Sequence, residues 1–104
     1  MAVYVDPLVK WGGSATFRWT HSCHMFADSL DELHAFALRI GLRRSWFQND
    51  KLPHYDLNPS RRCAALRAGA IELDLKQSVD KWAEISPYWR RVKEARAARD
   101  KPDV

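Results

Sequence analysis

The sequence predicts an α/β domain with a small, mostly parallel sheet of about four strands, two crossover helices and a C-terminal helical extension. Two segments each begin at a capping residue and end at a glycine, one from Ser29 to Gly41 and one from Asn58 to Gly69. Short β-rich runs precede and follow both of them. Strands that alternate with helices favour right-handed crossovers into a parallel sheet. We therefore expect an α/β core over residues 1–75 and a basic helical extension of the same domain over residues 76–104.

The composition is typical of a single folded domain. The chain has 104 residues, of which 46% are hydrophobic and 12% aromatic, which is enough to bury a core and argues against disorder. No apolar run approaches the ~18 residues that a membrane span needs, and no signal segment precedes the first strand. The two cysteines, Cys23 and Cys63, form no C-x-x-C pair, so we expect reduced thiols and a cytoplasmic protein.

The N-terminal part of the chain predicts one clear strand. Ala2–Val5 is a β-rich run that ends at Asp6, because Pro7 cannot donate to a ladder. Residues 8–16 contain a Gly-Gly-Ser sequence and are predicted to form a loop. Phe17–Thr20 alternates in polarity and is predicted to form a short strand or an extended segment.

The next strand and helix carry stronger signals. Cys23–Ala27 is predicted to be a strand that ends at Asp28. Ser29 then begins a helix, with Glu32 completing a capping box and Gly41 providing a left-handed stop. His34 falls within the apolar arc of this helix, where a hydrogen-bonded core histidine is the commoner outcome.

The middle of the chain repeats the same order of elements. Ser45–Gln48 is predicted to be a strand, and a polar loop leads from it to Asn58. Asn58 is a good N-cap, followed by Pro59 at the first helical position. The helix runs to Gly69, and Cys63 on it is predicted to be buried. Residues 70–75 alternate as a half-buried strand does.

Two further helices are predicted in the extension. The first covers Lys76 to Glu84, and the second begins at Ser86-Pro87 by the same combination of cap and proline. The second helix is basic, which is compatible with an anionic partner and also with a solvated face.

Polar residues follow the predicted strands, and these residues define the expected site. Ligands of open parallel sheets bind outside the carboxyl ends of the strands. By that rule, acidic, amide and imidazole side chains should lie along one edge of the sheet, here called the rim: Asp6, Asp28, Gln48, His54 and Asp56. His24 is included with them. Arg61 and Arg62, in the first turn of the helix that begins at Asn58, provide an anion cradle beside this rim.

One chemistry that fits these residues is metal-dependent hydrolysis. Asp6, Asp28 and Asp56 would hold Mg²⁺ or Mn²⁺, which prefer oxygen ligands, while Arg61 grips a phosphate. His54 and Asp56 would be the catalytic residues, with His54 moving a proton. The protein would then be a phosphoester hydrolase or nuclease.

Binding without a reaction fits the same residues. His24, Gln48, Arg61 and Arg62 would hold a nucleotide or nucleic acid, with Trp46 or Tyr55 stacked on a base. A third interpretation, from another class, is a protein-interaction module such as an inhibitor of a host protein. Its basic C-terminal helix and exposed Trp82 or Trp89 would then form the contact, and the acidic residues of the rim would be structural.

Several motifs occur in a recognisable order: Tyr4-Val5-Asp6, Cys23-His24, residues 27–37, residues 41–48 and His54-Tyr55-Asp56-Leu57. Over roughly residues 2–75 this order resembles the small bacterial and phage family called domain of unknown function 4031, which is marked by its YVD and HYD motifs. The resemblance implies a stand-alone cytosolic or phage-encoded protein. It brings no established activity and therefore no catalytic assignment.

Overall fold

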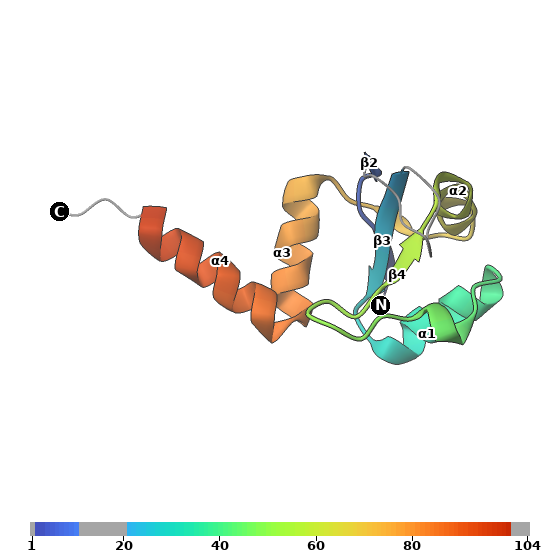
Figure 1. Ribbon diagram of the computed structural model, residues 1–104, viewed down its shortest axis with the longest axis horizontal. Helices are drawn as coiled ribbons and strands as arrows, with labels where there is room; N and C mark the ends of the chain where they lie inside the picture. Colours follow the sequence, from blue (N-terminus) through green and yellow to red (C-terminus); the bar gives the residue numbers. More distant parts are fainter. Residues whose placement is uncertain (1, 11–20, 101–104) are drawn as a thin grey trace.

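A computed structural model describes residues 2–10 and 21–100 of the chain (Figure 1). It contains five strands, four α-helices and one short 3₁₀ helix. The strands are β1 (Val3–Val5), β2 (Val9–Lys10), β3 (His21–Ala27), β4 (Tyr55–Leu57) and β5 (Ile71–Glu72). The helices are α1 (Leu30–Arg39), η1 (Arg44–Trp46), α2 (Pro59–Arg67), α3 (Leu75–Ile85) and α4 (Pro87–Asp100). The loop predicted over residues 8–16 is wrong at its start, because Val9–Lys10 form β2. The rest of that loop and the strand predicted over residues 17–20 lie outside the described residues.

The sheet is mixed rather than mostly parallel, which corrects the predicted topology. β1, β2 and β4 all pair antiparallel with the central strand β3, and only β5 pairs in parallel, with β1. The cause lies in the connection between the first two predicted strands. Parallel neighbours need a crossover of about a dozen residues or more, usually a helix. The sequence predicts no helix between Val5 and His21, so an antiparallel return is the outcome consistent with it.

The helices predicted to begin at Ser29 and at Asn58 are confirmed. The Ser29 hydroxyl accepts a hydrogen bond from the N–H of Glu32 at 3.2 Å, and α1 is followed by Gly41 with φ +85°. The side chain of Asn58 caps α2 by accepting from the N–H of Arg61 at 2.8 Å. Each cap satisfies one N–H that the first helical turn leaves without a partner.

Two predicted strands are wrong in extent or type. Ser45–Gln48 does not form a strand, because residues 44–46 turn into η1 and only Gln48 makes an isolated bridge, with His54. β5 stops after two residues. Asp74 then forms a reciprocal capping box with Gln77, so Leu75 begins α3 instead of ending the strand.

The sheet has helices on both faces, as Figure 1 shows. Odd-numbered residues of β1 and β3, among them Val5 and Met25, pack with α1 and α2 in the main core. The even-numbered Tyr4 and Phe26 face the other way and pack with Trp82 and Ile85 of α3. This separation follows from the two-residue period of a strand.

The C-terminal helix α4 extends away from the body and contacts α3 near the turn between them (Figure 1). Trp89, at its start, reaches the second core, with its ring centroid 5.2 Å from that of Trp82. Both tryptophans are therefore partly buried, whereas the protein-interaction hypothesis placed them at the surface. None of the described helices is long and apolar enough to cross a membrane.

Candidate metal site

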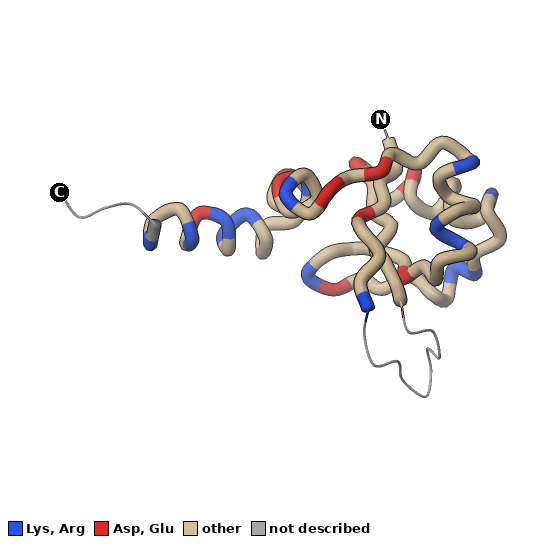
Figure 2. The backbone as a smooth tube through the Cα atoms, turned by 90° about the horizontal axis from the view of Figure 1, so that it is seen from above, with Lys and Arg blue, Asp and Glu red and all other residues tan. Residues whose placement is uncertain are grey.

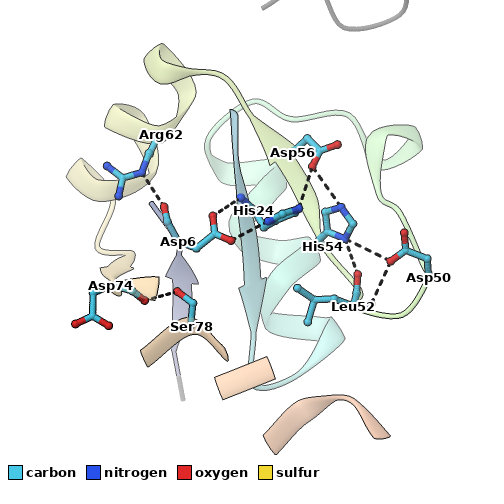
Figure 3. A network of polar contacts seen from close by, with 9 residues as sticks. All are labelled: Asp6, His24, Asp50, Leu52, His54, Asp56, Arg62, Asp74 and Ser78. Atoms are coloured by element: carbon cyan, nitrogen blue, oxygen red, sulfur yellow. Dashed lines mark hydrogen bonds and ion pairs between the residues drawn. The ribbon is translucent and has the colours of Figure 1, made fainter. Parts of the chain in front are cut away.

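A row of polar side chains crosses the face of the sheet that α3 partly covers. His24 on β3 stands directly opposite Asp56 on β4, and the N–H of Asp6, just after β1, donates to the carbonyl of His24. Side chains of directly paired residues share a face. Asp6, just after the end of β1, is therefore a neighbour of His24 on β3 and Asp56 on β4, and His54 joins them from the residue before β4 (Figure 3).

Asp6 is buried and fixes the orientation of His24. One carboxylate oxygen, Oδ1, accepts the backbone N–H of His24 at 2.6 Å, and Oδ2 lies 2.7 Å from its Nδ1. An ionised carboxylate only accepts hydrogen bonds, so Nδ1 of His24 carries the proton and donates it. The lone pair of the imidazole is then on Nε2, which points toward Asp56 (Figure 3).

His54 is oriented in the same way by a backbone group. Its Nδ1 lies 2.5 Å from the carbonyl oxygen of Leu52, which can only accept. Its Nε2 points to Asp56 Oδ1 at 3.3 Å. Burial alone would lower the pKa of His54. The hydrogen bonds to Asp56 and Leu52, with the charges of Asp56 and Asp50, outweigh burial and raise the pKa above its ordinary value.

The carboxylate of Asp56 is shared between the two histidines and an amide. Oδ1 faces Nε2 of His54 at 3.3 Å and Nε2 of His24 at 3.9 Å, while Oδ2 accepts from Nε2 of Gln48 at 2.5 Å. Burial would raise the pKa of Asp56, but the hydrogen bond and charge of His54, followed by Gln48 and His24, lower it. Asp56 is therefore ionised at neutral pH.

The three inward-facing donor atoms form a group that can hold one metal ion. Nε2 of His24, Nε2 of His54 and an oxygen of Asp56 all lie within 4.8 Å of one another. With metal–ligand bonds of about 2.1 Å, donors around a single ion stand roughly 3–3.4 Å apart. The His54–Asp56 distance already fits this spacing, and the His24–Asp56 distance requires a closure of about half an ångström.

The site is partly open to solvent. The side chain of His54 is 8% exposed, whereas those of His24 and Asp56 are 44% and 34% exposed. Three protein ligands with a solvent-facing side are typical of catalytic metal centres, which keep a position for water or substrate. Structural centres are closed by a fourth protein ligand.

Two residues that the sequence assigned to the site lie elsewhere. β3 runs antiparallel to β1, so Asp28 comes to the end of β1 opposite Asp6. There it accepts a hydrogen bond from the hydroxyl of Tyr4 and lies 3.7 Å from Nζ of Lys81. Tyr55 faces the main core and is 1% exposed, with its hydroxyl 2.9 Å from Nδ1 of His34. The hydrogen bond expected for His34 is thereby observed, on a half-buried side chain.

The two arginines in the first turn of α2 have separate environments. Nε of Arg62 donates to the carbonyl of Asp6 and Nη2 to Glu72, each at 3.1 Å, so its guanidinium connects α2 to β1 and β5. Arg61 lies over the ring of Trp46, with its Cζ 5.0 Å from the ring centroid. The predicted anion cradle therefore retains one guanidinium, that of Arg61, without a carboxylate partner among the described residues.

Sequence reasoning named every ligand of this group but missed how the ligands are combined. Asp6 was assigned to a metal, whereas in the structure it holds a histidine. Leu52 and Asp50, which contact His54, were not singled out. A signal for the shared face was available, because His54 and Asp56 are two residues apart in an extended segment and therefore lie on one side of it.

Comparison with known proteins gives one match. A family model described as "Protein of unknown function (DUF4031)" matches residues 3–84, which include every residue of the polar row. Neither the curated proteins nor the solved structures contain a match to this chain. Because the matched region covers most of the 104 residues, the chain belongs to the DUF4031 family.

Proposed function

We propose that the protein binds a divalent transition-metal ion through His24, His54 and Asp56 and uses it to hydrolyse a phosphoester. The observation that carries this proposal is that each of the three ligands has its outer polar atom occupied. The carboxylate of Asp6 accepts from Nδ1 of His24, and the carbonyl of Leu52 accepts from Nδ1 of His54. The amide of Gln48 donates to Oδ2 of Asp56. Such outer contacts are the usual support of metal-binding histidines and carboxylates.

The donor set indicates which metals to expect. Two imidazole nitrogens and one carboxylate suit Zn²⁺, Mn²⁺ or Fe²⁺ better than Mg²⁺, which prefers oxygen ligands. Mn²⁺ suits these three ligands and is also one of the two metals expected from the acidic residues of the sequence. His54, whose lone pair is directed to the same point as that of His24, is assigned here as a ligand and not as the group that moves a proton.

A divalent metal at this position would lower the pKa of a bound water and draw charge from a phosphoryl oxygen. The water oxygen forms the new bond to phosphorus, and the bond to the leaving oxygen breaks with its electron pair. The proton released by the water balances the proton taken up by the leaving oxygen. A phosphoester is favoured because Arg61, whose guanidinium is unpaired among the described residues, lies on the helix that follows Asp56.

The test begins with metal binding. The full chain is dialysed against Zn²⁺, Mn²⁺ or Mg²⁺ separately, and bound metal is measured by elemental analysis. We expect one equivalent of Zn²⁺ or Mn²⁺ and weak binding of Mg²⁺. His24→Gln, His54→Gln and Asp56→Asn should each lose the metal. Asp80→Asn removes a carboxylate that pairs with Lys93 on another surface, and it should bind as the wild type does.

Hydrolysis is then measured with bis(p-nitrophenyl) phosphate and labelled oligonucleotides in the metal that binds. We expect turnover that disappears with a chelator and with Asp56→Asn and that survives Asp80→Asn. Equal metal binding by wild type and Asp56→Asn would contradict the proposed metal site. Metal binding without turnover on any of these substrates would remove the hydrolase assignment and leave the metal site in place.

A further inference from the structure

An exposed tryptophan has the guanidinium groups of two arginines near its ring. Trp46, at the end of η1, is 41% exposed, so its indole ring is accessible from solvent. The Cζ atoms of Arg61 and Arg43 lie 5.0 Å and 5.8 Å from the centroid of its ring. Arg43 is the residue just before η1, and Arg61 lies on α2, on the other side of β4 in the sequence. Their guanidinium groups meet at this ring.

Among the residues that the structure describes, neither Arg43 nor Arg61 forms an ion pair with a carboxylate, whereas Arg62 on the same helix pairs with Glu72. Arg44, the next residue along η1, likewise lies over a ring, that of Phe47 at 4.9 Å. Figure 2 shows Lys and Arg gathered on this side of the molecule, around α1, η1 and α2.

The segments that carry Trp46 and Arg61 are next in the chain to those that contact or carry Asp56. Gln48, which donates to Asp56, is two residues beyond Trp46, and two residues span at most about 7 Å of backbone. The backbone N–H of Arg61 donates to the side chain of Asn58, which caps α2. Asn58 is two residues after Asp56 in the sequence. A ligand that contacts Trp46 therefore lies within reach of the metal site.

We infer that Trp46, Arg43 and Arg61 form a binding surface for single-stranded nucleic acid, whose phosphodiester bonds the metal site would cleave. This inference rests on the proposed function and names its substrate class. A base stacks on the indole ring, and the guanidinium groups turn from the ring to the flanking phosphates. Stacking on an exposed aromatic ring requires a free base face, which single strands offer and duplexes do not.

The test uses fluorescence anisotropy with labelled oligonucleotides of about 12 nucleotides, a length within the usual site size of such surfaces. The full chain is titrated with single-stranded DNA, single-stranded RNA of the same sequence, the DNA duplex and a mononucleotide, all in excess chelator. Because no metal is present, this binding is independent of the metal site, and a failure here is distinguishable from a failure of the proposed hydrolysis.

We expect at least one of the two single strands to bind more tightly than the duplex and the mononucleotide. The comparison of single-stranded DNA with single-stranded RNA shows which of the two nucleic acids the surface prefers. Trp46→Ala should weaken binding by about 5- to 150-fold, the range for loss of one stacked base. Trp46→Phe retains a ring and should recover most of the affinity. Circular dichroism shows whether Trp46→Ala is folded. If it is not, Trp46→Phe is the variant that tests the contribution of the ring. Quenching of tryptophan fluorescence in the wild type should follow the same titration.

Charge is tested with matched arginine variants. Arg43→Met and Arg61→Met should each weaken binding and reduce the slope of log affinity against log salt by about one. Arg91→Met removes the same charge from the exposed surface of α4 and should have a smaller effect. Unchanged binding by both Trp46 variants, equal affinity for the duplex, or an equal loss with Arg91→Met would each overturn the inference.

Discussion

The buried carboxylate of Asp6 contacts His24 at two points: Oδ1 accepts the backbone N–H at 2.6 Å, and Oδ2 lies 2.7 Å from the ring Nδ1. The first contact fixes the main chain of β3 and the second fixes the protonation of the imidazole. Asp6 thus acts on the proposed metal through His24. This separation of roles can be tested by a substitution that preserves the first contact and reverses the second.

Asp6→Asn is that substitution. The amide oxygen of asparagine can still accept the backbone N–H, but its NH₂ group donates toward Nδ1 of His24. The ring proton is then moved to Nε2, where it blocks the metal. We expect metal affinity to fall by about 10- to 100-fold, as it does when comparable outer contacts are lost. Isothermal titration with Zn²⁺ measures this change.

The matched control for this change is Asp80→Asn, which should leave the affinity unaltered. The melting temperature of the metal-free protein should be similar in both variants, since Asp6→Asn preserves the main-chain contact. An unchanged metal affinity in Asp6→Asn would show that the orientation of His24 does not depend on this carboxylate.

The raised pKa of His54 predicts how the stability of the metal-free protein depends on pH. A histidine with a folded-state pKa above its unfolded value of 6.5 stabilises the fold fully below pH 6.5. That contribution is lost as the pH rises through the folded-state pKa. Asp56 is ionised throughout this window, because its pKa is lowered from 3.8.

The measurement is the difference in unfolding free energy between wild type and His54→Gln, in chelator, on both sides of pH 6.5. We expect the difference to shrink as the pH rises above 6.5. With saturating Zn²⁺ the trend should reverse, because the metal needs the deprotonated ring. A difference that is flat with pH in chelator would contradict the contacts that raise the pKa of His54.

Local signals explain why the helices were predicted correctly and the sheet was not. The caps Ser29 and Asn58 act over three residues, and both helices they begin are observed. Strand direction depends on partners far apart in the sequence, such as Tyr4 and Phe26. The Asp74–Gln77 capping box is also a local signal, but the alternation of residues 70–75 predicted a strand across its first residue.

The candidate site shows the same division. The residue types that can bind a metal or move a proton, His24, His54 and Asp56, were identifiable from their chemistry. Their arrangement depends on the register of β3 against β4, which places His24 opposite Asp56. The rule for parallel sheets included Asp28 because it assumes that all strands end at one edge, and the antiparallel β3 ends at the other.

Removal of the α2 cap should cost a measurable part of the stability. Asn58→Ala leaves the N–H of Arg61 without the acceptor that now lies at 2.8 Å. We expect the free energy of unfolding to fall by about 1 kcal/mol, within the range of 0.5–2 kcal/mol for such caps. Urea denaturation measures this difference, and Asn58→Asp, which retains a capping oxygen, should recover most of it. A loss of the same size in Asn58→Asp would show that the cap is not the cause.

The two cysteines should differ sharply in reactivity. Cys23 is 2% exposed, and burial, followed by the charge of Asp6, raises its pKa to about 12. Cys63 is exposed on α2, contrary to the burial predicted from its helical position. Thiolates are the reactive form, so a thiol reagent should modify one residue of the native protein rapidly. Cys63→Ser should abolish this rapid phase.

Cys23 should react only when β3 separates from its neighbours, because both its burial and its raised pKa protect it. In urea above the unfolding midpoint, both thiols of the wild type should react at similar rates. In native conditions the slow rate then reports the free energy of the opening that exposes β3. Metal binding by His24 on the same strand should slow it further, since a ligand that binds only the folded state lowers the population of open molecules. Rapid native modification of Cys63→Ser would place Cys23 at the surface and contradict the packing of the sheet on α1 and α2.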